Sequence, residues 1–589
     1  MGAMKRQSFY LTMRDGVNIA VDLCLPDRVQ PGARLPAILH QTRYWRAIDF
    51  RLPLGLLAGV GMYDVLKIRP AFLHHGYAWI SVDVRGSGAS YGYQTGPYPP
   101  ESVEDIREIA DWIVAQSWSN GKIGVYGISY DGLTAISALR ARHPAIAACA
   151  PTYTVFDLYT DIAGIGGVPF SWFHRTWGLG TKALDANQVG FFTGLLPKLV
   201  ARGVRPVDAD GSRTLLAQAI RDHERNWDVY QTSFQVSSRD DSLPYDPDWS
   251  LDSYSPHLHL EEIEASGAAI YAYSGWFDAS FQQSAIRIFL NLKNPGNRLT
   301  IGPWDHGGRY NVSPTVQRKS DYRQHISELL HFFGAHLGGV QVAAGIPGQK
   351  PVRYFTLVED RWREADTWPP PNTHTRTFYL AAANALSPDR PAGLEDWDAY
   401  RVDYSTGTSV SSRWDSLIGG LHNPKIYSDR IEQDMKLLIY TSAPLAQPME
   451  VTGHPFVRLY ITSTAKDGNF FAYLEDVDER GGVTYVTEGM LRAMHRKLSC
   501  RTPPYRDVVP YRTFSRADAA PLEPGEITEI AFDLLPTSHL FRAGHCIRLA
   551  LGGADRDHFF IPSGEPPVLR FYRDSERPSR VDLPVMARE

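Results

Sequence analysis

The sequence predicts a doubly wound, mostly parallel α/β sheet with an inserted helical cap, followed by a C-terminal jelly-roll β-sandwich. Apolar strand patterns alternate with helical patterns over residues 1–150 and again over 251–345, as they do in parallel sheets. The alternation breaks over residues 151–250, which we expect to form the cap. Short strands separated by turn residues fill residues 346–589, a pattern typical of a β-sandwich.

The first elements of the predicted sheet can be placed from the N-terminus. An Asp15-Gly16 turn between two alternating apolar runs predicts a hairpin. Pro36–His40 reads as a buried strand, and Tyr44 follows its carboxyl end. Ligands of open α/β sheets gather outside such strand ends, so Tyr44 is well placed for chemistry. An ordinary loop tyrosine that packs on its neighbours is the alternative.

A strand, a sharp turn and a helix meet at Ser129. Gly127 precedes the serine, and Gly132 opens an apolar segment with helical spacing. This order is typical of a nucleophile elbow, which holds its serine in a strained conformation with the hydroxyl clear of the sheet. The second glycine falls one place later than in the usual Gly-x-Ser-x-Gly pattern. A glycine-rich turn with an ordinary serine is therefore the alternative interpretation.

Two later strand ends supply an acid and a histidine, Asp278 and His306. The order Ser…Asp…His is that of α/β-hydrolases. Serine is a weak nucleophile without a base, and the imidazole needs an acid to orient it. We favour Asp278 over Asp305, because Asp305 adjoins His306 in sequence and neighbouring side chains at a turn seldom face each other. Three histidines lack such a setting and are expected to be structural: His40, His74 and His75.

Composition excludes several classes of protein. A net charge of -5 argues against a nucleic-acid binder or a basic membrane-surface protein. No apolar run approaches the roughly 20 residues that span a bilayer, and no signal pattern opens the chain, so we expect a cytoplasmic protein. We also expect no metal, because the cysteines are scattered without metal-ligand spacing. They are Cys24, Cys149, Cys500 and Cys546.

Several motifs in a fixed order carry a resemblance to a known family. They are Met13–Gly16, Asp83–Ser90, Gly127–Gly132, Gly275–Asp278, Gly302–His306 and the region Leu535–Leu549. Together they resemble the family of cocaine esterase, α-amino-acid ester hydrolase and X-prolyl dipeptidyl-peptidase, over nearly the whole chain. The resemblance implies an α/β-hydrolase fold with a helical cap and a jelly roll, and no cofactor.

The tetrahedral intermediate of acyl transfer needs preorganised donors for its negative oxygen. One donor is expected to be the backbone N–H of Tyr130, the residue after the nucleophile. In the family a tyrosine hydroxyl supplies the second, and the resemblance implies that Tyr44 is this residue. Its context, Thr42–Trp45, departs from the usual Pro-Tyr of the family.

These residues predict a serine hydrolase that cleaves carboxylic esters, or amides, through an acyl-enzyme. A cap rich in Trp and Phe favours an apolar acyl group.

An X-Pro dipeptidyl-peptidase or a β-lactam or amino-acid ester acylase of the same family is the alternative. Such a peptidase would hold a free amino terminus, for which Asp131, Asp157 and Asp161 are candidates. A carbohydrate-binding jelly-roll protein is a more distant alternative. The expected partner is a small ester or amide, not a nucleic acid or a membrane. The resemblance leaves a homodimer open, because relatives often associate.

Overall fold

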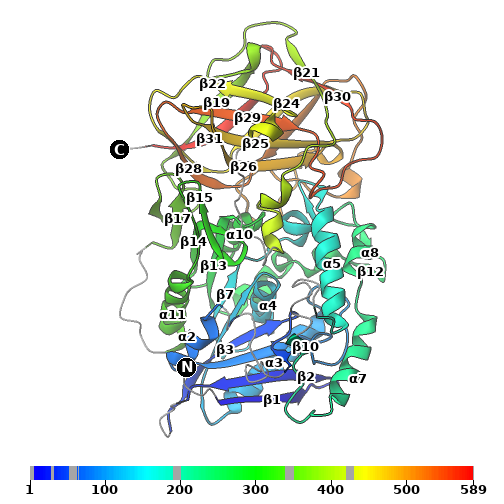
Figure 1. Cartoon of the computed structure of the whole chain (residues 1–589), viewed down its shortest axis with the longest axis vertical. Helices are drawn as coiled ribbons and strands as arrows, with labels where there is room; N and C mark the ends of the chain where they lie inside the picture. The colour runs from blue at the N-terminus through cyan, green and yellow to red at the C-terminus, as the bar shows by residue number, and fades with distance from the viewer. Residues whose placement is uncertain are drawn as a thin grey trace.

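The computed structural model describes residues 5–27, 32–51, 63, 66–189, 200–338, 350–418 and 430–587. Two parts are stacked along the long axis of the molecule (Figure 1). The α/β part occupies the lower half of that view and a β-sandwich occupies the upper half. Helix α5 (Ser171–Asp185) of the cap stands along one side of the α/β part, below the sandwich.

A twelve-stranded sheet forms the centre of the α/β part. Its middle strands β5, β3, β6, β7, β13 and β14 run parallel to one another. At one edge, β1 and β2 form the hairpin expected around Asp15-Gly16. Ten of the twelve strands follow one another in the order β1 (Lys5–Thr12), β2 (Asn18–Leu25), β5 (Ala78–Asp83), β3 (Leu35–Thr42), β6 (Ser119–Ile128), β7 (Ile146–Thr152), β13 (Ala269–Phe277), β14 (Arg298–Asp305), β15 (Tyr310–Ser313) and β16 (Val316–Lys319).

Helices cover both faces of this sheet, as the alternation of patterns predicts. On one face α2 and α11 meet through the rings of Phe72 and Phe333, and both belong to one apolar cluster. On the other face α3, α4 and α10 bury Ile106, Leu133 and Ile286 in a second cluster. These helices and α9 are α2 (Ile68–His74), α3 (Pro100–Ala115), α4 (Tyr130–Ala138), α9 (Leu260–Ala265), α10 (Phe281–Asn291) and α11 (Arg323–Leu337).

The cap lies between β7 and α9 in sequence. Its described helices are α5, α7 (Thr214–Asp222) and α8 (Val229–Ser233). It also contains short strand pairs, which the sequence pattern did not show because two- to five-residue strands leave no periodicity. These strands are β8 (Gly164–Ile165), β9 (Val168–Pro169), β10 (Ala201–Val204), β11 (Ser242–Leu243) and β12 (Asp246–Ser250), with β10 paired to β4 (Ile48–Phe50).

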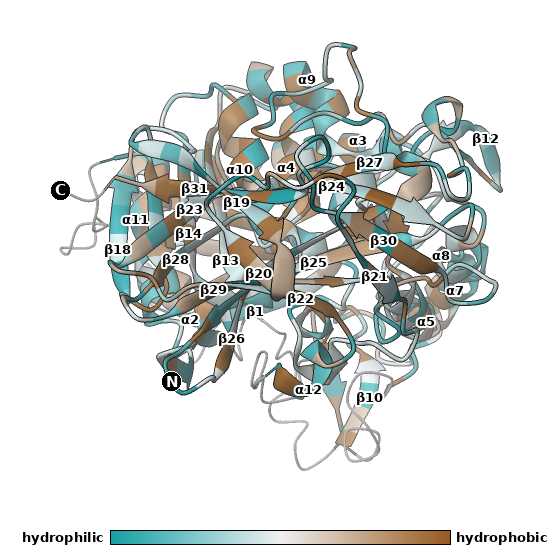
Figure 2. Cartoon of the chain, turned by 90° about the horizontal axis from the view of Figure 1, so that it is seen from above, coloured by the Kyte–Doolittle hydropathy of each residue, from teal (hydrophilic) through white to brown (hydrophobic). Residues whose placement is uncertain are grey.

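The C-terminal part is a mostly antiparallel β-sandwich around its own apolar cluster. Inward and outward residues alternate along strands such as β24, and Figure 2 shows polar and apolar bands mixed along these strands. Its strands are β19 (Thr373–Ala381), β20 (Ala385–Ser387), β21 (Trp397–Arg401), β22 (Leu438–Ser442), β23 (Met449–Gly453), β24 (Phe456–Ser463), β25 (Asn469–Val477), β26 (Val483–Arg492), β27 (Thr528–Asp533), β28 (Thr537–Phe541), β29 (Cys546–Gly552), β30 (Val568–Tyr572) and β31 (Arg580–Met586); a short helix, α12 (Ile431–Asp434), precedes β22.

One strand expected in the sandwich belongs to the α/β sheet instead. The run from Val352 forms β17 (Val352–Thr356), which pairs in parallel with β14, and β18 (Arg361–Ala365) then pairs with β17. An apolar strand pattern does not say which sheet the strand joins, and β17 is buried along its whole length. The expected linker Gly345–Lys350 lies outside the described residues except for its last residue. Among the described helices, none is long and apolar enough to cross a membrane.

Candidate active site

Ser129 lies at the bend between β6 and α4 with φ 65° and ψ −124°. A positive φ strains any residue other than glycine, and such strain is typical of functional sites. Gly127 and Gly132 make the bend sterically accessible. A Cβ on Gly127 would lie 2.0 Å from the carbonyl oxygen of Asp131, and one on Gly132 would lie 2.8 Å from that of Thr152. The late second glycine thus serves the close approach of α4 to the end of β7.

Asp278 and His306 meet beyond the carboxyl ends of β13 and β14. His306 Nδ1 lies 2.6 Å from Asp278 Oδ1. Asp278 is fully buried, and its other oxygen accepts a hydrogen bond from Ser274 Oγ at 2.7 Å. Asp305 instead accepts the backbone N–H of Tyr310 at 2.8 Å, and burial raises its pKa to about 6. Of the two acids weighed from the sequence, Asp278 is therefore the one that the structure pairs with His306.

The loop of His306 packs against the elbow. A Cβ on Gly307 would lie 3.6 Å from Ile128, the residue before Ser129. The His306 ring lies 5.6 Å from the ring of Phe281, which shares a pocket with Ser129. Among the hydrogen bonds of the described residues, none joins the Ser129 hydroxyl to His306. That bond stays a prediction.

Tyr44 lines the same pocket as Ser129, and its hydroxyl has one fixed partner. Trp177 Nε1 of α5 donates to Tyr44 Oη at 2.8 Å. Burial raises the pKa of Tyr44 above its ordinary value, so the phenol keeps its proton. Because Trp177 uses an acceptor lone pair, the Tyr44 proton remains available for a substrate oxygen. Nothing in the sequence pattern singled out Trp177, which reads as one aromatic residue of an amphipathic cap helix.

An apolar pocket opens at Ser129. Its wall comes from the cap, from the loop after β7 and from the first turns of α4 and α10. None of its described lining residues is an Asp, Glu, Lys or Arg. Burial lowers the pKa of His174, which also lines it, to about 4, so this imidazole is neutral near pH 7. Prominent apolar lining residues are Leu158, Ile162, Phe173, Trp177, Trp227 and Val229.

The three carboxylates considered for binding an amino terminus do not line this pocket. Each has a partner within the protein instead. Asp131 is 2.9 Å from His40, Asp157 is 2.7 Å from Arg239, and Asp161 is 2.6 Å from Arg287. A substrate amine at Ser129 would therefore find no free carboxylate among these three.

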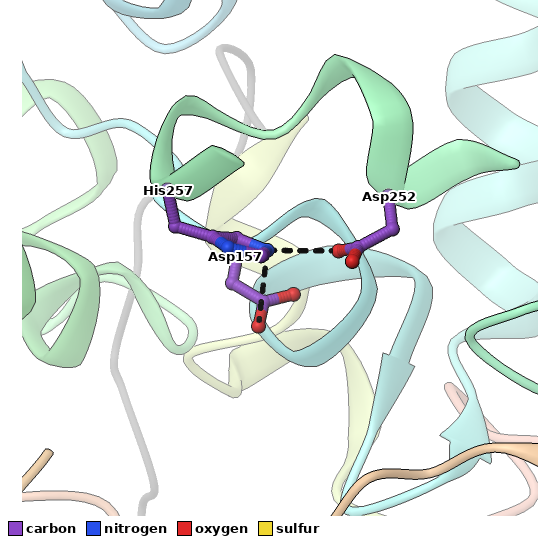
Figure 3. Close-up of side chains that lie close together, drawn as sticks. All are labelled: Asp157, Asp252 and His257. Carbon is purple, nitrogen blue, oxygen red and sulfur yellow. Dashed lines mark hydrogen bonds and ion pairs between the residues drawn. The ribbon is translucent and has the colours of Figure 1, made fainter. Parts of the chain in front are cut away.

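A cluster of Asp157, Asp252 and His257 has the ligand types of a metal site (Figure 3). The guanidinium of Arg239 already occupies it. Arg239 Nη2 lies 2.7 Å from Asp157 Oδ2, and Nη1 lies 2.9 Å from Asp252 Oδ1. The positive charge that these carboxylates require is supplied by the chain itself, so the residues do not fit a metal ion.

The serine lies in a strained bend at the end of a parallel strand, and two later strand ends carry an acid–histidine pair. This arrangement defines a serine hydrolase of the α/β-hydrolase fold. The chain belongs to the X-Pro dipeptidyl-peptidase (S15) family, whose model matches residues 15–308. Residues 344–582 match the X-Pro dipeptidyl-peptidase C-terminal non-catalytic domain.

Full-length relatives agree with this assignment. The chain is 48% identical to a proposed serine esterase of Mycobacterium bovis, over 99% of this chain and 96% of the relative. It is 26% identical to the cocaine esterase of a Rhodococcus species, over 98% and 97%. A solved α-amino acid ester hydrolase superposes with a TM-score of 0.70 at 20% identity, over 99% and 96% of the two chains. This last likeness supports the fold: an α/β-hydrolase with a cap and a C-terminal jelly roll.

Proposed function

We propose that this serine hydrolase cleaves carboxylic esters whose acyl group is uncharged and apolar. The observation that carries the proposal is the pocket at Ser129, which has aromatic and aliphatic walls and no charged side chain among its described lining residues. The relatives named as esterases support the choice of ester over amide.

The proposed reaction runs through an acyl-enzyme. Ser129 attacks the ester carbonyl while His306 takes its proton, and Asp278 stabilises the resulting imidazolium. The Tyr44 hydroxyl and the Tyr130 N–H donate to the oxyanion. Tyr130 is the first residue of α4, where backbone N–H groups are not used by the helix itself. His306 then protonates the leaving alcohol, and water attacks the acyl-enzyme by the same route.

A matched pair of substrates tests the acyl preference. The methyl esters of phenylacetic acid and phenylglycine differ only by an α-amine, which is largely charged at pH 6. The amine must lose its proton to enter an apolar site, so with a pKa of about 7.7 kcat/KM should be about fiftyfold higher for phenylacetate. Methyl mandelate, polar but uncharged, is the control and should fall between them.

The peptidase alternative is decided in the same assay. Hydrolysis of X-Pro anilides with a kcat/KM above that of methyl phenylacetate would overturn the proposal in favour of the peptidase activity for which the family is named. A fluorophosphonate should label Ser129 under either activity, whereas a carbohydrate-binding protein would not react.

We also propose that the enzyme acts in the cytoplasm. In the part of the chain that the structure describes, no disulfide joins any of the four cysteines, and disulfides are rare in that compartment. Measuring the esterase activity in cell fractions would test this. A homodimer remains a further proposal, which light scattering of the purified chain would test.

A further inference from the structure

The loop that carries Asp278 is held by an arginine of the C-terminal part. Arg413 Nη2 donates to the carbonyl oxygen of Trp276 at 2.5 Å, and Nη1 donates to that of Ala279 at 3.3 Å. Arg413 has no solvent exposure. Its guanidinium therefore binds the backbone on both sides of the catalytic acid.

A second contact from the same segment reaches the histidine loop. The Ser416 hydroxyl approaches the carbonyl oxygen of Phe277 at 3.4 Å. The Ser416 carbonyl in turn accepts from Arg309 Nη2 at 2.6 Å, and Arg309 Nε donates to the carbonyl oxygen of His306 at 3.0 Å. The segment 413–416 thus fastens both loops that carry the acid–histidine pair.

Strain in the acid loop explains why it needs such support. Ala279, directly after Asp278, has φ 43°, in the left-handed region that residues with a Cβ rarely adopt. Such a conformation persists only where the surroundings determine it from several sides. Arg413 and Ser416 supply these contacts from residues more than 130 positions later in the chain.

We propose that Arg413 is a positioning residue for Asp278, so that the part of the chain matched as a non-catalytic domain helps to set the geometry of catalysis. This inference rests on the proposed role of Asp278. If it holds, Arg413 acts only through the acid. Its loss should lower turnover in an enzyme that has Asp278 and should matter little in one that lacks this carboxylate.

A double-mutant cycle tests this dependence. A misplacement of about 1 Å at a catalytic group can cost about a hundredfold, so we expect Arg413→Met to lower kcat by about that factor with KM nearly unchanged. In an Asp278→Asn background the same change should lower kcat by less than about threefold, because grouped catalytic residues are not additive. An equal loss in both backgrounds, or an unchanged kcat in the single variant, would overturn the proposal.

The controls separate positioning from folding. Arg430→Met removes another buried arginine of the same part, one that binds Glu475 at 2.6 Å inside the sandwich. It should lower the melting temperature and leave kcat unchanged. If Arg413→Met does not fold, Arg413→Lys and Ser416→Ala replace it in the cycle, with smaller losses that must again vanish in the Asp278→Asn background.

The rate of labelling by a fluorophosphonate gives a readout that does not depend on the ester chosen. If wild-type enzyme is labelled but hydrolyses no ester, the proposed substrate is wrong. The double-mutant cycle can then still be measured with the labelling rate in place of kcat. If Arg413→Met slows labelling as much in the Asp278→Asn background as in wild type, the positioning role itself is wrong.

Discussion

Two buried histidine–aspartate pairs lie near the elbow of Ser129 and share little beyond their hydrogen bond. His306 Nδ1 lies 2.6 Å from Asp278 Oδ1, and His40 Nε2 lies 2.9 Å from Asp131 Oδ2. Either pair alone has the geometry that orients a catalytic imidazole. The difference between them therefore lies in their surroundings.

The first pair sits where ligands reach a parallel sheet. Asp278 and His306 follow the carboxyl ends of β13 and β14, and His306 packs beside Phe281 of the pocket. The ring of His306 therefore lies beside a residue of the pocket that Ser129 lines.

The second pair is closed off by its neighbours. His40 lies inside β3, and its Nδ1 is buried with no hydrogen-bond partner. Tyr63 donates to Asp131 Oδ2 at 3.2 Å and accepts the N–H of Ile128 at 3.0 Å. The pair thus supports the backbone before and after Ser129 from inside the protein. The two pairs differ in their place in the sheet and not in their hydrogen-bond distance, and on this ground we propose the His306 pair as the catalytic one.

The nucleophile should give the largest effect. Ser129→Ala should lower kcat by on the order of a millionfold, because a triad without its serine has no nucleophile to activate. The fold should persist, since the change removes only one hydroxyl from a half-buried site. Ester turnover by purified variant protein, with a thermal melt alongside, is the measurement. Appreciable turnover would remove Ser129 from the mechanism.

Aspartate-to-asparagine substitutions in the two pairs test most directly which pair takes part in catalysis. Asp278→Asn keeps the shape but no longer holds the catalytic tautomer, and such a change lowers kcat by about ten-thousandfold in a known triad. Asp131→Asn should leave kcat within about tenfold of wild type, since it acts on no reacting atom. Steady-state kinetics of both variants decide between the pairs. Similar losses in the two variants would mean that the His40 pair shares in catalysis.

Tyr44→Phe comes next. It removes one hydrogen-bond donor and almost no volume, so kcat should fall about a hundred- to a thousandfold while KM changes little. Trp177→Phe is the matched variant, because it removes the donor that holds the Tyr44 hydroxyl. Trp177→Phe should lower kcat less than Tyr44→Phe does, because the Tyr44 hydroxyl proton is still present. A Tyr44→Phe enzyme with wild-type kcat would show that the second oxyanion donor lies elsewhere.

The positions of site residues that lie within or beside a local sequence pattern could be predicted from the sequence. The strand–turn–helix pattern around Ser129 is local, and Asp278 and His306 each follow a recognisable strand. The preference for Asp278 over Asp305 also rested on a local argument, that adjacent side chains diverge. The alternation of strand and helix likewise predicted both covered faces of the sheet.

Residues that act from a distance could not be predicted. Trp177 and Arg413 each reach the site across more than 130 positions of sequence, and a single tryptophan or arginine in a cap or loop carries no periodic signal. Strand β17 was misplaced for a related reason. Its pattern predicts a strand, while its partner β14 is chosen by tertiary packing.

The smallest effect on activity is expected from the His40 pair, and it should appear in stability instead. Asp131→Leu leaves the buried His40 ring without its hydrogen-bond acceptor, and an unsatisfied buried donor costs about 1–3 kcal/mol. Replacing both partners by apolar residues is often neutral, so His40→Leu/Asp131→Leu should recover much of the lost stability. Urea unfolding of the single and double variants measures this. A double variant with restored stability but reduced kcat would show that the His40–Asp131 pair contributes to turnover as well as to stability. The proposed functional difference from the His306–Asp278 pair would then be wrong.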